Sequence, residues 1–173
     1  MDLLTVTTNE LERFPIRGVA AVCLRAAMRV RSAMHSNCDE DLDVANRVLQ
    51  GTERCDVLYD RAESLYRLAS IAVAEYRSTR RDEFRRLALA GAIIHSAVDC
   101  IADLDHDHQA ALTNGMLSLR SCGKFNDELL SLAITRDLRH AEYRLHKEPG
   151  QSDLLQKFGP LWIDQPPEWY RES

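Results

Sequence analysis

The feature that most constrains this chain is an apolar side chain at every third or fourth position along two long segments, residues 55–77 and 84–101. This spacing places the side chains on one face of an α-helix, because the helix has about 3.6 residues per turn. The apolar seams are Leu58, Ala62, Leu65, Ala69, Ala72 and Tyr76 in the first segment and Phe84, Leu87, Gly91, Ile94, Val98 and Ile101 in the second. Both segments are therefore predicted to be long helices of a bundle.

The second of these helices is expected at the centre of the bundle. Leu89 and Ile93 lie off its seam, so the helix is apolar on more than one face, and such a helix is usually surrounded by others. Gly91 lies on the seam and has no side chain. It predicts that a neighbouring helix approaches closely at this point.

Shorter or weaker patterns predict the rest of the bundle. Further helices are expected at residues 15–34, 39–50, 108–121 and 130–146. Pro15 fits the first position of the first of them, and Gly115 is expected to interrupt the third. A turn is expected at residues 122–127, between the third and the fourth.

These patterns together predict an all-α, single-domain bundle of about five to seven helices. The bundle spans residues 15–146 and follows a lead-in over residues 1–14, in which Thr8 is expected to cap a short turn. The prolines and aromatic residues of residues 149–173 predict an irregular C-terminal strap that lies extended across the bundle.

Composition narrows the class of protein. The chain has 173 residues, of which 45% are hydrophobic and 28% charged, which is typical of a soluble globular domain. Its net charge of −5 argues against a nucleic-acid partner. It has no apolar run of the length that a membrane span needs, and we expect no secretory signal. The five cysteines have no Cys-x-x-Cys spacing, so we expect reduced thiols, at least three of them in the core, and a cytoplasmic protein.

Residues 102–109, ADLDHDHQ, concentrate aspartates and histidines. They fail the EF-hand calcium pattern, because His108 stands where glycine is needed and Asn114 where glutamate is needed. If the preceding helix continues through this stretch, two imidazoles and two carboxylates fall on one stripe. These candidate metal ligands are His95, Asp99, Asp103 and His106. Imidazole and carboxylate together suit zinc, iron or manganese.

The Asp-x-x-His pair formed by Asp103 and His106 resembles half of the carboxylate-bridged di-metal site of ferritin-like bundles. That resemblance implies a metal-dependent enzyme, a hydrolase or an oxidoreductase. The family needs a second such helix, and the nearest counterpart here, Glu142 and His146, has a different spacing.

The alternative interpretation of the same stretch is structural. Asp105 or Asp107 suits the N-cap of the following helix, and Asp99 and Asp103 would face water on the outside of a simple bundle. His95 would then be a histidine at the edge of the core. We favour this interpretation, under which no cofactor is required.

Two acidic pairs offer a second enzymatic hypothesis. Glu40 and Asp43, and Asp60 and Glu63, each place two carboxylates on one helix face. The arrangement is similar to that of the all-α nucleoside triphosphate pyrophosphohydrolases, which implies bound magnesium. The residue types depart from that family's Glu-x-x-Glu and Glu-x-x-Asp at three of the four positions.

Arginines gather around the predicted turn in YRSTRRDEFRR. The candidate anion-binding residues are Arg77, Arg80, Arg81, Arg85 and Arg86. They would form a positive patch for a phosphate or another anion. The alternative is a solvated helix end whose arginines pair with nearby acids.

No catalytic motif stands out, because the chain lacks a nucleophile elbow, a phosphate loop and a dinucleotide-binding glycine pattern. Cys38 and Cys122 lie near predicted helix ends and could be exposed. We therefore expect a non-catalytic helical bundle that acts as a protein-interaction or self-association module, with a protein partner or a homo-oligomer. The alternative is a metal-dependent helical-bundle enzyme.

Overall fold

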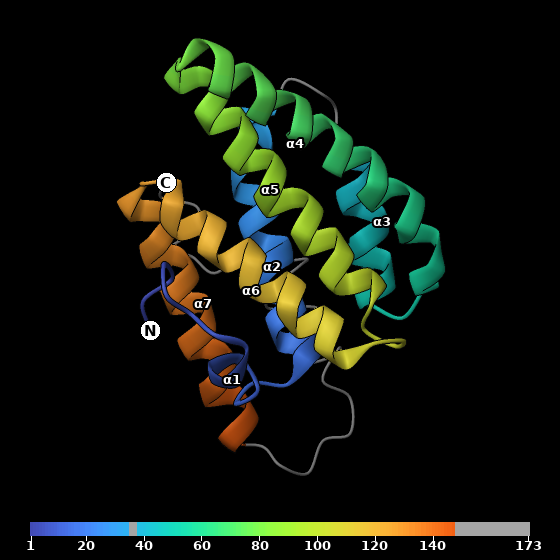
Figure 1. Ribbon diagram of the computed structural model, residues 1–173. Helices are drawn as coiled ribbons and strands as arrows, with labels where there is room; N and C mark the ends of the chain where they lie inside the picture. The colour runs from blue at the N-terminus through green and yellow to red at the C-terminus, as the bar shows by residue number, and fades with distance from the viewer. Residues whose placement is uncertain (35–37, 148–173) are drawn as a thin grey trace.

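The computed structural model describes residues 1–34 and 38–147, with the backbone alone at positions 140 and 142–147. Within these ranges the chain forms seven α-helices and two 3-10 turns and no strand (Figure 1). The elements are α1 (Thr8–Leu11), α2 (Ile16–Val30), η1 (Arg31–Ala33), α3 (Asp39–Leu49), η2 (Cys55–Leu58), α4 (Tyr59–Thr79), α5 (Asp82–Ala102), α6 (His108–Lys124) and α7 (Glu128–Lys147). The all-α prediction is confirmed, and the predicted strap at 149–173 lies outside the described residues.

Two helices, α5 and α2, form the centre of the bundle. Figure 1 shows α4 at one edge beside α5, and α1 and α7 at the opposite edge. The helix α5 packs against α4, α6 and α2, as its apolar faces predicted. The sequence assigned α2 a single apolar face, whereas every residue from 18 to 27 is buried. This helix is covered all round by α3, α5, α6 and α7, because its many alanines allow neighbours on every side.

The contact between α4 and α5 follows the predicted seams. Ala62, Leu65, Ala69 and Ala72 of α4 are all buried. A Cβ atom built on Gly91 would lie 2.8 Å from the Cβ atom of Ala69, a distance that real Cβ atoms do not reach. The predicted close approach at Gly91 is therefore confirmed.

Several helix ends differ from the prediction by a few residues. The N-cap of α1 is Thr7 rather than Thr8, and Thr7 and Glu10 form a capping box with Thr7 Oγ1 accepting from the Glu10 N–H at 3.3 Å. Pro15 is the N-cap of α2 rather than its first helical residue. The helix α6 passes through Gly115 without a break. This glycine is buried, and a Cβ atom here would lie 2.8 Å from Val19 Cγ1, so the glycine allows close packing against α2.

All five cysteines are buried and free. The expected exposure of Cys38 and Cys122 is wrong, because the helix ends on which they lie are covered by neighbouring elements. Burial raises the pKa of the Cys122 thiol far above its usual range and that of Cys55 to about 11. Thiols held in their protonated form react slowly as nucleophiles. None of the described helices is both long and apolar enough to cross a membrane.

Candidate functional site

The predicted metal stripe requires α5 to continue to His106, and α5 ends at Ala102. A turn follows, in which the backbone N–H groups of His106 and Asp107 donate to the carbonyl oxygen of Asp103 at 3.1 and 2.9 Å. The helix α5 therefore does not extend to His106. The four predicted ligands do not share one helical face.

His95 and Asp99 do lie together, one turn apart on α5. The Nδ1 atom of His95 is 3.5 Å from Asp99 Oδ2, and the two side chains are 17% and 33% exposed. Tyr66 of α4 packs edge-on against the His95 ring, with the ring centroids 5.4 Å apart. The pair thus lies partly buried on α5, with the His95 ring in contact with α4, and it supplies two potential metal ligands.

Asp103 has other partners. Tyr59 donates its hydroxyl to Asp103 Oδ1 at 3.3 Å, and the side-chain amide of Asn114 donates to Oδ2 at 3.0 Å. Burial raises the pKa of the Asp103 carboxyl above its usual 3.8, although both hydrogen bonds lower it. His106 is exposed, with its ring 6.2 Å from the Tyr59 ring. Asp103 therefore links the end of α5 to α4 and α6.

The other two aspartates of ADLDHDHQ hold the α5–α6 connection in place. Asp107 is the N-cap of α6, and its side chain accepts from the Ala110 N–H at 3.0 Å. Asp105 forms an ion pair with Arg17 at 2.9 Å and accepts from the Cys55 thiol at 3.3 Å. The structural interpretation is thus confirmed for Asp107.

Within the described part of the chain, no three side chains of histidine, cysteine, aspartate or glutamate lie close enough together to hold a metal ion. His95 and Asp99 contact each other, whereas Asp103 and His106 both contact Tyr59. Binding of zinc, iron or manganese by these four residues stays a prediction, and it would require the α5–α6 turn to rearrange.

One carboxylate of each acidic pair binds an arginine. Glu40 and the adjacent Asp41 both bind Arg61, at 3.0 and 2.8 Å, and Glu63 binds Arg67 one turn away on α4. These contacts tie α3 to α4 and stabilise α4 locally. The carboxylates of Glu40 and Glu63 are therefore engaged in ion pairs, and the magnesium site implied by the pyrophosphohydrolase resemblance stays a prediction.

The arginine cluster divides into two groups. Arg77, Arg80 and Arg81 are exposed around the α4–α5 turn, where Arg81 pairs with Glu83 at 2.8 Å. The other two arginines point towards the end of α6. Arg85 donates to the Lys124 carbonyl oxygen at 3.1 Å, and the Arg86 guanidinium lies over the Phe125 ring, 5.2 Å from its centroid. The five arginines therefore have different partners, and anion binding by all five stays a prediction.

Arg86 instead meets two arginines that the sequence did not single out. A pocket of about 560 Å³, here called the arginine pocket, is lined by Arg29 of α2, Arg86 of α5 and Arg136 of α7. Ser32 and Asp127 also line it, and its apolar wall includes Phe125, Leu129, Leu130 and Leu132. No spacing in the sequence brings these three arginines together, because they lie on three separate helices.

A second hollow, here called the α4 groove, lies between the C-terminal half of α4, the start of α5 and Met34. It has a volume of about 280 Å³, and its apolar lining residues are Met34, Leu68, Ile71, Ala72, Phe84 and Leu87. Glu75 is its one charged lining residue in the described part of the chain. Leu68 and Ile71 are 40% and 61% exposed. The sequence did hold a signal here, since both residues are apolar and lie off the α4 seam.

A comparison of this chain with protein-family models, with curated proteins and with solved structures gave no match. Function is therefore argued from these surfaces alone.

Proposed function

We propose that this chain is a non-catalytic helical module that self-associates through the α4 groove. The observation that carries the proposal is the exposure of Ile71, 61% of whose surface is open, beside a groove with an apolar lining. Exposed apolar surface is costly in water at about 25 cal/mol per Å². A patch of this kind is typical of an interaction surface.

The same patch contains both a projecting side chain and a hollow. Ile71 projects at the rim, and the groove that it borders has a volume of about 280 Å³. In a two-fold dimer each subunit presents the same patch, so Ile71 of one copy can enter the groove of the other. The helix α4 lies at the edge of the bundle, where a second copy can approach (Figure 1).

The test is the oligomeric state of the full chain, measured by sedimentation velocity over a range of concentrations. We expect a concentration-dependent dimer for the wild type and a monomer for Ile71→Glu, because the substitution would place a charge inside the interface. The matched control is Leu117→Glu on α6, which changes another exposed aliphatic residue (43% exposed) and should leave the dimer intact. A wild-type chain that stays monomeric at high micromolar concentration would refute self-association. If Ile71→Glu and Leu117→Glu had the same oligomeric state, the assignment of the interface to the α4 groove would be refuted.

A further inference from the structure

We propose that the arginine pocket binds a small anion that carries an apolar body, with a carboxylate or phosphate group held by guanidinium groups. The pocket volume of about 560 Å³ lies within the range of about 300–1,000 Å³ that is usual for small-molecule sites. The proposal is independent of self-association, because the pocket and the α4 groove have no lining residue in common, although both include residues of α5.

The charge of the lining favours an anion. Three arginines and a single aspartate are among its described lining residues. That aspartate, Asp127, lies at the start of α7, and its Oδ1 atom accepts from the Leu130 N–H at 3.0 Å. Its charge is thus placed against the positive end of a helix. Guanidinium groups bind carboxylates and phosphates through paired, parallel hydrogen bonds.

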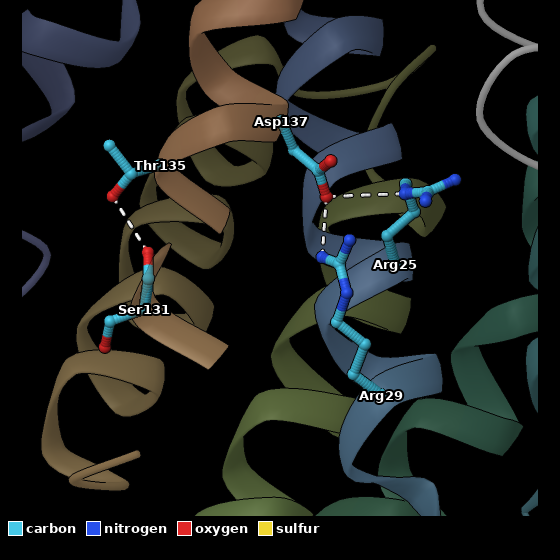
Figure 2. Close-up of polar contacts among 5 residues, drawn as sticks. All are labelled: Arg25, Arg29, Ser131, Thr135 and Asp137. Carbon is cyan, nitrogen blue, oxygen red and sulfur yellow. Dashed lines mark hydrogen bonds and ion pairs between the residues drawn. The ribbon is translucent and has the colours of Figure 1, made fainter. Parts of the chain in front are cut away.

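Arg29 and Arg86 are held in position by contacts. Arg29 donates to Asp137 Oδ2 at 2.6 Å, and Arg25 donates to the same oxygen at 3.3 Å (Figure 2). Figure 2 shows that both arginines come from α2 and the aspartate from α7. Arg86 rests on the ring of Phe125. Side chains that are already fixed lose little entropy when a ligand binds.

The apolar wall indicates the second part of the ligand. Leu129 and Leu132 are 69% and 48% exposed, although both line a pocket that also contains guanidinium groups. A hydrocarbon chain or ring lying over these leucines would remove apolar surface from water while its anionic group reached Arg86 and Arg136. A simple inorganic anion would use only the arginines.

The probe is 1-anilinonaphthalene-8-sulfonate, an aromatic anion whose fluorescence rises in apolar surroundings, titrated into the full chain. Dodecanoate and dodecyl phosphate should displace it. Dodecanol and inorganic phosphate, which each lack one half of the proposed chemistry, should displace it at least tenfold less well. The affinity for dodecanoate should also fall as salt is added, because exposed guanidinium groups are screened.

The double variant Arg86→Gln/Arg136→Gln should weaken dodecanoate binding about tenfold, since it removes two exposed charge contacts. The matched control, Arg77→Gln/Arg81→Gln, removes the same charge at the α4–α5 turn and should bind as the wild type does. Circular dichroism checks that both variants are folded. Equal affinities of the two double variants would overturn the proposal, and so would equal displacement by dodecanol and dodecanoate. Loss of the probe signal in Ile71→Glu would overturn it as well, because the probe would then occupy the α4 groove.

Discussion

The substitution Gly91→Ala tests how closely α4 and α5 pack. In an unconstrained helix this change would stabilise the protein by about 1 kcal/mol, because alanine is the better helix former. Here the new methyl group would lie 2.8 Å from the Cβ atom and 3.1 Å from the Cα atom of Ala69. Carbon atoms prefer separations of about 3.5–4.0 Å, so the two helices would have to separate locally by about 1 Å.

The cost of this separation should exceed the gain in helix propensity. Overpacking a core costs about 1–3 kcal/mol, and the upper part of that range applies because neither Ala69 atom can rotate away. Subtracting about 1 kcal/mol for propensity leaves a net loss of about 1–2 kcal/mol. Urea denaturation would measure it, and the melting temperature should fall by about 2–8 °C.

A double-mutant cycle with Ala69→Gly isolates the contact. The variant Gly91→Ala/Ala69→Gly moves the methyl group from one helix to the other and conserves both volume and overall helix propensity. It should lie within about 1 kcal/mol of the wild type, with a favourable coupling of about 2 kcal/mol between the two changes. The control Gly115→Ala should cost less, since its one contact below 3.4 Å is with a side-chain atom, Val19 Cγ1, and not with the backbone of the neighbouring helix. A Gly91→Ala variant more stable than the wild type would refute the reasoning.

Three further predictions follow from the polar contacts. Asp137→Asn should destabilise the fold by about 3–5 kcal/mol in urea denaturation, because it removes the buried carboxylate that two arginines share. The control Glu63→Gln, which breaks an exposed ion pair, should cost less than about 1 kcal/mol. Burial raises the pKa of Asp103, so this carboxyl stabilises the fold below its usual pKa of 3.8 and loses that contribution as the pH rises. The melting temperature of Asp103→Asn relative to that of the wild type should therefore increase from about pH 3 to pH 7. A decrease over this range would contradict the burial effect. Elemental analysis of protein purified without a chelator or tag should find no stoichiometric zinc, iron or manganese. One metal ion per chain that is lost in His106→Ala would instead support metal binding by the predicted ligands.

The helices were predictable because their signal is local. The seams of α4 and α5 could be read from the sequence, and Leu58, Ala62, Leu65 and Ile94 are indeed buried. Helix ends were less predictable, since a cap depends on which of several neighbouring residues reaches a free N–H group. Thr7 and Thr8 are both suitable caps by residue type, and only the structure shows that Thr7 bonds to Glu10.

The candidate sites were harder to predict, because they depend on where each helix ends and on contacts between residues far apart in the sequence. The metal stripe assumed that a helix continued through residues 103–106, and the turn there removes the shared face on which the argument rested. The arginine cluster was found as a run in the sequence, but the structure divides it and assigns Arg86 to a different group of residues.

The sequence by itself determined that the described part of the chain is all-α, where its long helices lie and which faces of α4 and α5 are buried. These properties follow from apolar periodicity within one segment, which needs no knowledge of the neighbours. Only the tertiary structure decided that Arg29, Arg86 and Arg136 share a pocket, that Asp137 binds two arginines of α2, and that Ile71 stays exposed. Such contacts join residues as much as 112 positions apart. Helix packing brings these residues together, and the periodicity of a single segment does not specify how helices pack.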